Sequence, residues 1–165
     1  MSKIRAQAAM EYLMTYGWAL LVIAMVISIL VFINPFSPPA GCRFDSGSFT
    51  CDAPAFANSG NNTVLYLNIY NAANNNVLIN ATYCTADRTA ASPVIPIPAA
   101  STLVKRQANY TVNGLDCYRN GAPAGRTAAG TDFSGKVWVF YRNEEDPQTY
   151  PLRVASAAIS GKVSG

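Results

Sequence analysis

The sequence predicts an α+β fold, in which a long N-terminal hydrophobic α-helix precedes a small antiparallel β-sandwich or barrel. The helix is predicted because residues 12–33 contain no charged residue and are mostly apolar. The β-domain is predicted because residues 42–165 contain short runs of branched and aromatic residues separated by turn signals. The 165-residue chain is long enough for one such domain and an appendage.

The N-terminal segment has the order of charge and hydrophobicity expected of a membrane anchor. Lys3 and Arg5 form a short positive region that favours the cytoplasm. A helix over residues 12–33 would extend ~33 Å, enough to cross a bilayer. Pro35 ends the helix, because proline cannot continue it. Residues 37–41 then form a short, stiff linker.

A cleaved secretory signal peptide would have a shorter apolar core followed by a small-residue cleavage site. The simplest alternative is therefore an uncleaved signal anchor. Two features distinguish this segment from a plain anchor. Residues 6–9 are small and polar, and Glu11 lies just inside the helix. A carboxylate at the head of a lipid-soluble helix is costly unless a specific group pairs with it.

The run Gln-Ala-Ala-Met-Glu-Tyr-Leu-Met-Thr-Tyr-Gly-Trp-Ala at residues 7–19 resembles the start of archaeal type IV pilins, which carry a class III signal peptide. The resemblance implies that residues 1–6 are removed by a cut between Ala6 and Gln7. Residues 7–36 would then serve as a membrane anchor and later as the filament core. The chain departs from the family pattern at Ala9, where serine is common, and at Thr15, where leucine is common.

The same resemblance assigns filament assembly to Gln7 and Glu11. Cleavage would free the amine of Gln7, which is positive at neutral pH. In a filament, Glu11 of one subunit would pair with the Gln7 amine of a neighbour. Breaking one partner of a buried charge pair costs ~3–5 kcal/mol, so the pair would fix the axial register of the helices.

Residues 42–165 are expected to form an extracellular β-domain. Leu65, Leu67 and Ile69 alternate with more polar residues, which indicates a half-buried strand. The turn at residues 74–76 would join this strand to the next as a hairpin. The run 136–141 is apolar on both faces, as in a central strand, and with the last strand it resembles the C-terminal hairpin of archaeal pilin-like domains. The expected strands are residues 63–70, 77–84, 93–98 at an edge, 102–112, 115–118, 136–141 and 150–163.

The chain contains four cysteines, Cys42, Cys51, Cys84 and Cys117. An even number in an exported domain favours disulfides, and the absence of a close Cys-x-x-Cys pair argues against a zinc ribbon. Three pairings are possible. We favour Cys42–Cys51, which closes a short loop, and Cys84–Cys117, which joins distant strands. Free buried thiols in a reducing compartment are the alternative.

Three Asn-x-Thr tripeptides begin at Asn61, Asn80 and Asn109, and they are candidate N-glycosylation sites. Such short patterns also arise by chance in a chain rich in Asn and Thr. The alternative is an unmodified hydrophilic surface.

The composition excludes several other functions. The chain has no histidine, which removes the commonest general base and most zinc sites. The aspartates are scattered, and no glycine-rich phosphate loop is present, so we expect no catalytic residues, metal or cofactor. A net charge of +3 is too small to indicate nucleic acid.

The expected function is that of a structural subunit of an archaeal type IV pilus-like surface filament, with a role in adhesion. Its partners would be copies of itself, the prepilin peptidase and pilus assembly machinery, and the membrane before assembly. The alternative is a membrane-anchored extracellular binding domain that does not polymerise. The sequence leaves open the adhesion target, the abundance of the subunit and the helical symmetry.

Overall fold

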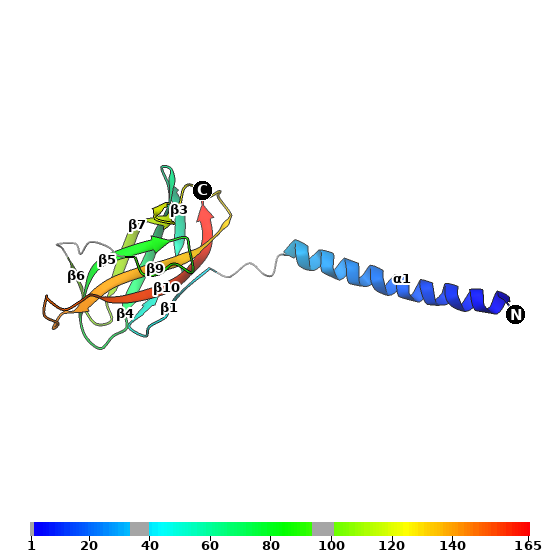
Figure 1. Cartoon of the computed structure of the whole chain (residues 1–165), viewed down its shortest axis with the longest axis horizontal. Helices are drawn as coiled ribbons and strands as arrows, with labels where there is room; N and C mark the ends of the chain where they lie inside the picture. The colour runs from blue at the N-terminus through cyan, green and yellow to red at the C-terminus, as the bar shows by residue number, and fades with distance from the viewer. Residues whose placement is uncertain (1, 34–39, 94–100) are drawn as a thin grey trace. The chain divides into compact units, whose positions relative to one another are not determined.

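The structure, a computed structural model, describes residues 2–33, 40–93 and 101–165. The chain divides into two compact units, Met1–Ser37 and Pro38–Gly165. The first contains helix α1 (Ser2–Ile33), and the second contains all ten strands (Figure 1).

In α1 the structure describes the side chains of Met14 and residues 16–31. Over this described part, apolar residues lie on all sides of the helix, which therefore has no polar face there. The hydroxyl of Ser28 donates a hydrogen bond of 2.7 Å to the carbonyl of Ala24, which satisfies its polar group within the helix. Over the described part of the chain, no helix is long and apolar enough to cross a membrane.

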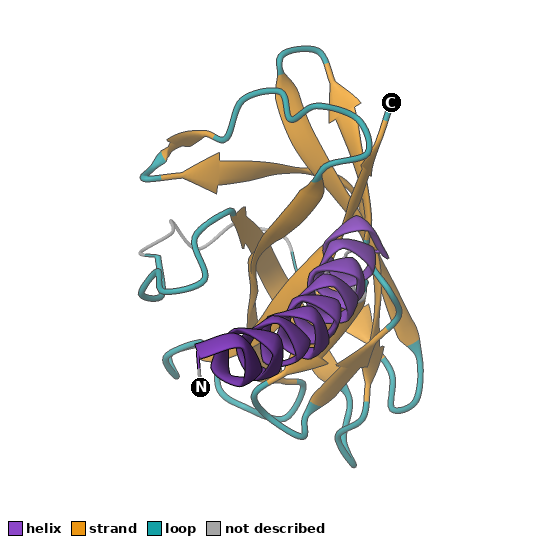
Figure 2. Cartoon of the chain, turned by 90° about the vertical axis from the view of Figure 1, so that its right-hand side faces the viewer, coloured by secondary structure: helices purple, strands orange, loops and turns teal. Residues whose placement is uncertain are grey.

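The second unit is built from strands and connecting loops (Figures 1 and 2). Its strands are β1 (Gly41–Phe44), β2 (Phe49–Cys51), β3 (Ala55–Ser59), β4 (Asn62–Asn71), β5 (Val77–Thr85), β6 (Thr102–Val104), β7 (Asn109–Arg119), β8 (Ala122–Pro123), β9 (Asp132–Asn143) and β10 (Arg153–Ser164).

Six of these strands close into a barrel in the order β3–β4–β7–β5–β9–β10, with β10 pairing back to β3. The shorter strands β1, β2, β6 and β8 extend the sheet from β10, β4, β5 and β7 respectively. Most pairs are antiparallel, but β10 pairs with β3 in parallel and β5 pairs with β7 in parallel.

The predicted fold class is therefore wrong. The structure is mostly β, and the described apolar part of the helix is the short segment 16–31 rather than a long hydrophobic helix. Of the sandwich and the barrel that were expected, the domain is a closed barrel, and its strand pairing is mixed rather than antiparallel. A barrel that closes through two parallel pairs leaves the same alternating sequence pattern as an antiparallel one, because side chains alternate in both.

The barrel interior holds the apolar side chains that alternate along the strands. Val137 and Val139 of β9 are fully buried, and Tyr141 follows on the same face. The strand β9 pairs with β10 on one side and with β5 on the other, as its two apolar faces predicted. The aromatic rings of Phe49 and Tyr141 pack edge to face with their centroids 4.8 Å apart, which is a preferred geometry for a pair of aromatic rings.

The predicted hairpin between residues 63–70 and 77–84 is wrong. The strand β4 pairs with β2, β3 and β7, whereas β5 pairs with β6, β7 and β9. The side chain of Asn71, at the end of β4, is 1% exposed. Its amide nitrogen lies 2.9 Å from the Asn75 carbonyl and 3.2 Å from the Val104 carbonyl, so it ties the turn after β4 to the end of β6.

The expected strand 102–112 is two strands, β6 and β7. Gln107, between them, has a φ of 61°, a left-handed conformation that interrupts an extended strand. The expected short strand 115–118 is the second half of β7. The expected edge strand 93–98 lies outside the described residues except for Pro93.

The four cysteines form two disulfides, Cys42–Cys51 and Cys84–Cys117, which are the pairings that the sequence favoured. Cys42–Cys51 links β1 to β2. Cys84–Cys117 joins β5 to β7 within the parallel pair and is fully buried in the core. The second disulfide therefore crosslinks one of the two parallel contacts that close the barrel.

Candidate functional site

The described part of α1 presents an apolar surface to solvent. We name this the α1 surface, and it comprises Met14, Tyr16, Trp18, Leu20, Leu21, Val22, Ile23, Met25, Val26, Ile27, Ile29, Leu30 and Val31. Their exposed fractions run from 41% to 81%. Isolated exposed apolar residues are ordinary, but a continuous patch of this kind marks an interaction site.

The residues predicted to act in cleavage and assembly belong to α1 and precede the α1 surface in the sequence. Ala6, Gln7 and Glu11 are helical, but their side chains lie outside the described part of the structure. The cut after Ala6 and the pairing of Glu11 with a Gln7 amine stay predictions from the sequence.

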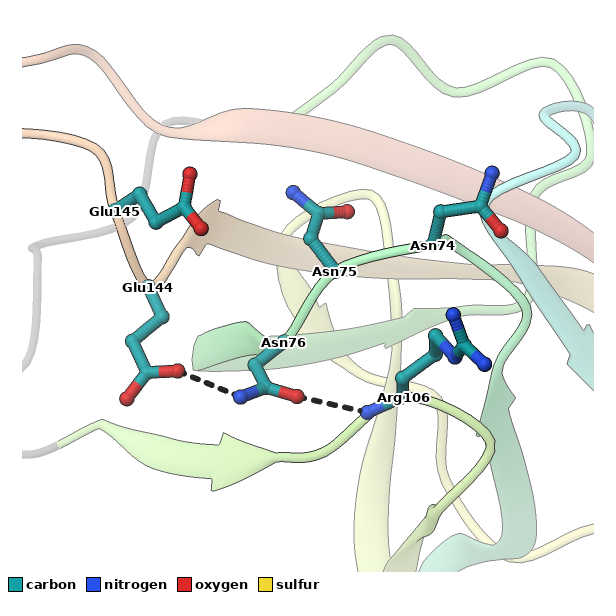
Figure 3. Close-up of a pocket in the computed structure, with 6 residues that line it drawn as sticks. All are labelled: Asn74, Asn75, Asn76, Arg106, Glu144 and Glu145. Atoms are coloured by element: carbon teal, nitrogen blue, oxygen red, sulfur yellow. Dashed lines mark hydrogen bonds between the residues drawn. The ribbon is translucent and has the colours of Figure 1, made fainter.

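The barrel carries a separate polar cleft of about 360 Å³, a size that suits a small ligand. Its lining residues come from three segments: the turn after β4, the loop after β6 and the loop after β9 (Figure 3). They are Asn74, Asn75, Asn76, Arg106, Glu144 and Glu145.

Asn76 organises this cleft. Its side-chain amide donates to the Glu144 carboxylate at 2.7 Å, and its side-chain oxygen accepts from the Arg106 backbone N–H at 3.0 Å (Figure 3). The Glu144 N–H in turn donates to the Asn76 carbonyl at 3.1 Å. These bonds hold the three segments together. The groups available to a ligand are hydrogen-bonding amides, carboxylates and a guanidinium, which suit a polar molecule.

The sequence did not reveal this cleft. The sequence predicts only a turn at the three asparagines. The signal that could have indicated more is the run of three amides, but nothing in the sequence places Arg106 and Glu144 beside it. Among the described residues, no group of three acidic or cysteine side chains is arranged to hold a metal ion.

Three titratable groups of the barrel have shifted pKa values. A hydrogen bond of 2.9 Å to the Asp52 carboxylate, together with its negative charge, raises the pKa of the Tyr70 hydroxyl. Partial burial, and then the neighbouring Tyr118, raises the pKa of Tyr83. Hydrogen bonds from the Thr89 N–H and hydroxyl lower the pKa of Asp87, because they stabilise its charged form. None of these groups lines the cleft, so they do not indicate catalysis there.

The three candidate glycosylation asparagines lie on different parts of the barrel. Asn61 is in the turn between β3 and β4, Asn80 is in β5, and Asn109 begins β7. Asn61 and Asn109 are exposed, whereas Asn80 is half-buried.

Comparison with known proteins identifies no relative of this chain. No family model matches the chain, and no match was found among curated proteins or among solved structures.

Proposed function

We propose that the protein is a structural subunit of a cell-surface filament of the archaeal type IV pilin kind, and that it assembles through α1. The observation that carries the proposal is the contrast between the exposed α1 surface and the closed barrel. Apolar side chains gain roughly 25 cal/mol for each Å² removed from water, so a helix that exposes thirteen of them favours any arrangement that covers them.

Neighbouring copies of α1 are the partners that we propose for this surface. Because the described part of α1 is apolar on all sides, several helices packed around it are needed to cover it, as in the core of a filament. The sequence adds the predicted cut before Gln7 and the pairing of Gln7 with Glu11. The two disulfides support a location outside the cytoplasm, because such bonds persist in oxidising compartments.

The first test is the sequence of the mature N-terminus. The full chain is expressed in a host that supplies a prepilin peptidase and the pilus assembly machinery, and the surface material is examined by mass spectrometry. We expect a mature chain that begins at Gln7. A mature chain that retains Lys3 and Arg5 would contradict the proposal.

The second test measures the contribution of the α1 surface to assembly. Ile27→Lys places a charge at a position that is 55% exposed in the single chain but buried in a filament. We expect the filament yield to fall by more than about tenfold, because burying an unpaired charge is costly. Val154→Lys, at an exposed position of β10, is the matched control and should leave the yield unchanged. Glu11→Ala should permit cleavage but reduce filaments.

The alternative function is that of an extracellular binding domain that does not polymerise. The observation that favours it is the polar cleft, whose three segments are held in place by Asn76. Under this alternative, Ile27→Lys would leave surface display unchanged, and Asn76→Ala would abolish binding of a polar ligand such as an oligosaccharide. A screen of the full chain against an oligosaccharide array, with Asn76→Ala as the comparison, would separate the two functions.

A further inference from the structure

The three Asn-x-Thr tripeptides differ in whether the folded protein leaves them accessible. A transferase that modifies such a tripeptide must reach the asparagine amide and must also bind the hydroxyl two residues later. Both side chains therefore need to be exposed on the folded surface, or the modification has to take place before folding.

The tripeptide of Asn61 fails this condition at its threonine. Asn61 is exposed, but Thr63 is 0% exposed. The Thr63 hydroxyl lies 3.0 Å from the Gly125 carbonyl and 2.9 Å from the Thr127 hydroxyl, and it accepts from the Thr127 N–H at 3.2 Å. Releasing this threonine requires the loop after β8 to leave the β3–β4 turn.

The tripeptide of Asn80 fails at the asparagine. Asn80 and Thr82 are half-buried within β5, next to β9. The side-chain oxygen of Asn80 is buried and has no hydrogen-bond partner. The backbone irregularity between Ile79 and Ala81 places Asn80 outside the regular pairing with β9. Access to its amide requires part of β5 to separate from the barrel.

The tripeptide of Asn109 meets the condition. Asn109 and Thr111 are both exposed and lie two residues apart in β7, so they are on the same outer face. Within the described residues, the Thr111 hydroxyl donates a hydrogen bond of 2.9 Å to the Asn68 side-chain oxygen, and this bond is exposed to water. The preceding residues Lys105, Arg106 and Gln107 are also exposed, which leaves room for an enzyme at the start of the strand.

We propose that Asn109 is the N-glycosylation site of the folded protein, and that Asn61 and Asn80 are acceptors only in the unfolded chain. The donor would be a lipid-linked oligosaccharide phosphate. The Asn109 amide nitrogen would form a bond to the anomeric carbon while the bond from that carbon to the phosphate oxygen breaks. The lipid phosphate would leave with the electron pair, and one amide proton would pass to a base of the transferase. The inference rests on the export that the proposed function requires.

A reaction with purified components tests this inference. The full chain with both disulfides intact is incubated with an oligosaccharyltransferase and a lipid-linked oligosaccharide, and the modified sites are identified by mass spectrometry. Synthetic peptides of residues 57–67, 76–86 and 105–115 give the rate for each tripeptide without the fold. We expect the folded chain to be modified at Asn109 at a rate within about tenfold of its peptide, and at least about 100-fold more slowly than the peptides at Asn61 and Asn80, because these two need local opening.

Two variants complete the experiment. Asn109→Gln should remove the modification of the folded chain, and Asn113→Gln is the matched control, because Asn113 is exposed on the same strand but begins no Asn-x-Thr tripeptide. Modification of folded Asn61 or Asn80 at the rate of its peptide would overturn the inference, as would slow modification of Asn109. Either result would leave the proposed function intact, because filament yield is measured separately with Ile27→Lys.

Discussion

The same kind of side chain has opposite environments in the two units of this protein. Ile23 of α1 is 54% exposed, whereas Ile69 of β4 is 1% exposed. In the second unit, the strands close into a barrel that encloses the apolar residues, and two disulfides crosslink its strands. The barrel therefore buries its own apolar residues, whereas those described in α1 are left exposed, which is the difference that the proposed assembly through α1 would remove.

Removal of residues 1–37 gives the most direct test of this comparison. We expect the remaining chain to be monomeric, because it lacks the α1 surface, and we expect the full chain to self-associate. The free energy of unfolding of the barrel should change by less than about 0.5 kcal/mol, as for a change away from the core. Analytical ultracentrifugation and urea denaturation measure the two effects. A shortened chain that is unfolded would show that the barrel is not self-sufficient.

Removal of the disulfides should have the largest effect on the stability of the barrel itself. For a sequence separation of 33, the chain-entropy model gives a loss of roughly 4 kcal/mol for the Cys84→Ala, Cys117→Ala double variant. For a separation of 9, it gives roughly 3 kcal/mol for Cys42→Ala with Cys51→Ala. Urea denaturation measures both. The reverse order would indicate that the link between β1 and β2 matters more than the crosslink between β5 and β7.

A methyl group at Gly135 should destabilise the barrel by about 3 kcal/mol, at the upper end of the usual range for overpacking. A Cβ there would collide with the backbone carbonyl of Thr85, which β9 cannot move away from without losing its pairing with β5. Thermal unfolding of Gly135→Ala measures the loss. Gly47→Ala is the control, because a Cβ at Gly47 has open space. Equal unfolding temperatures for the two variants would contradict the close approach of β5 and β9.

The smallest expected effect is a change in how the stability of the barrel depends on pH under alkaline conditions. Tyr83 stacks on Tyr118 with ring centroids 5.2 Å apart, and its pKa is raised in the folded protein. Because the neutral form is favoured by folding, this contribution is complete below the ordinary pKa of tyrosine and is lost as the pH rises through the folded pKa. The stability of the wild type should therefore fall more steeply above about pH 10 than that of Tyr83→Phe. The exposed Tyr150→Phe is the control. Parallel curves for all three proteins would contradict the assignment.

The parts of the fold that depend on local patterns could be predicted from the sequence. The alternation at Leu65, Leu67 and Ile69 indicated the inward face of β4, and the apolar run 136–141 indicated β9. The disulfide pairing that the sequence favoured among three possibilities is the one observed. The predicted pairing of β4 with β5 failed because it assumed a local hairpin, whereas β4 pairs with β7 and the Asn71 amide at its end bonds to residues more than thirty positions away.

The candidate sites were predictable to a smaller extent. The apolar character of residues 16–31 was visible in the sequence, although the long hydrophobic helix assigned to it was wrong. The polar cleft was missed because Arg106 and Glu144 are distant in sequence from Asn76. Among the three glycosylation tripeptides, the sequence shows the same chemistry each time. Only the tertiary structure distinguishes the buried Thr63 from the exposed Thr111.

The parallel contact between β3 and β10 has a consequence for the time course of folding. Phe56 pairs with Val163, so the barrel closes only after β10 is available to the rest of the domain. Contacts of such large sequence separation slow folding, because the entropy of a long loop is lost before the contact forms. Until β10 is available, the edge of β3 that it later covers is therefore unpaired, and in this interval the chain is most prone to aggregate.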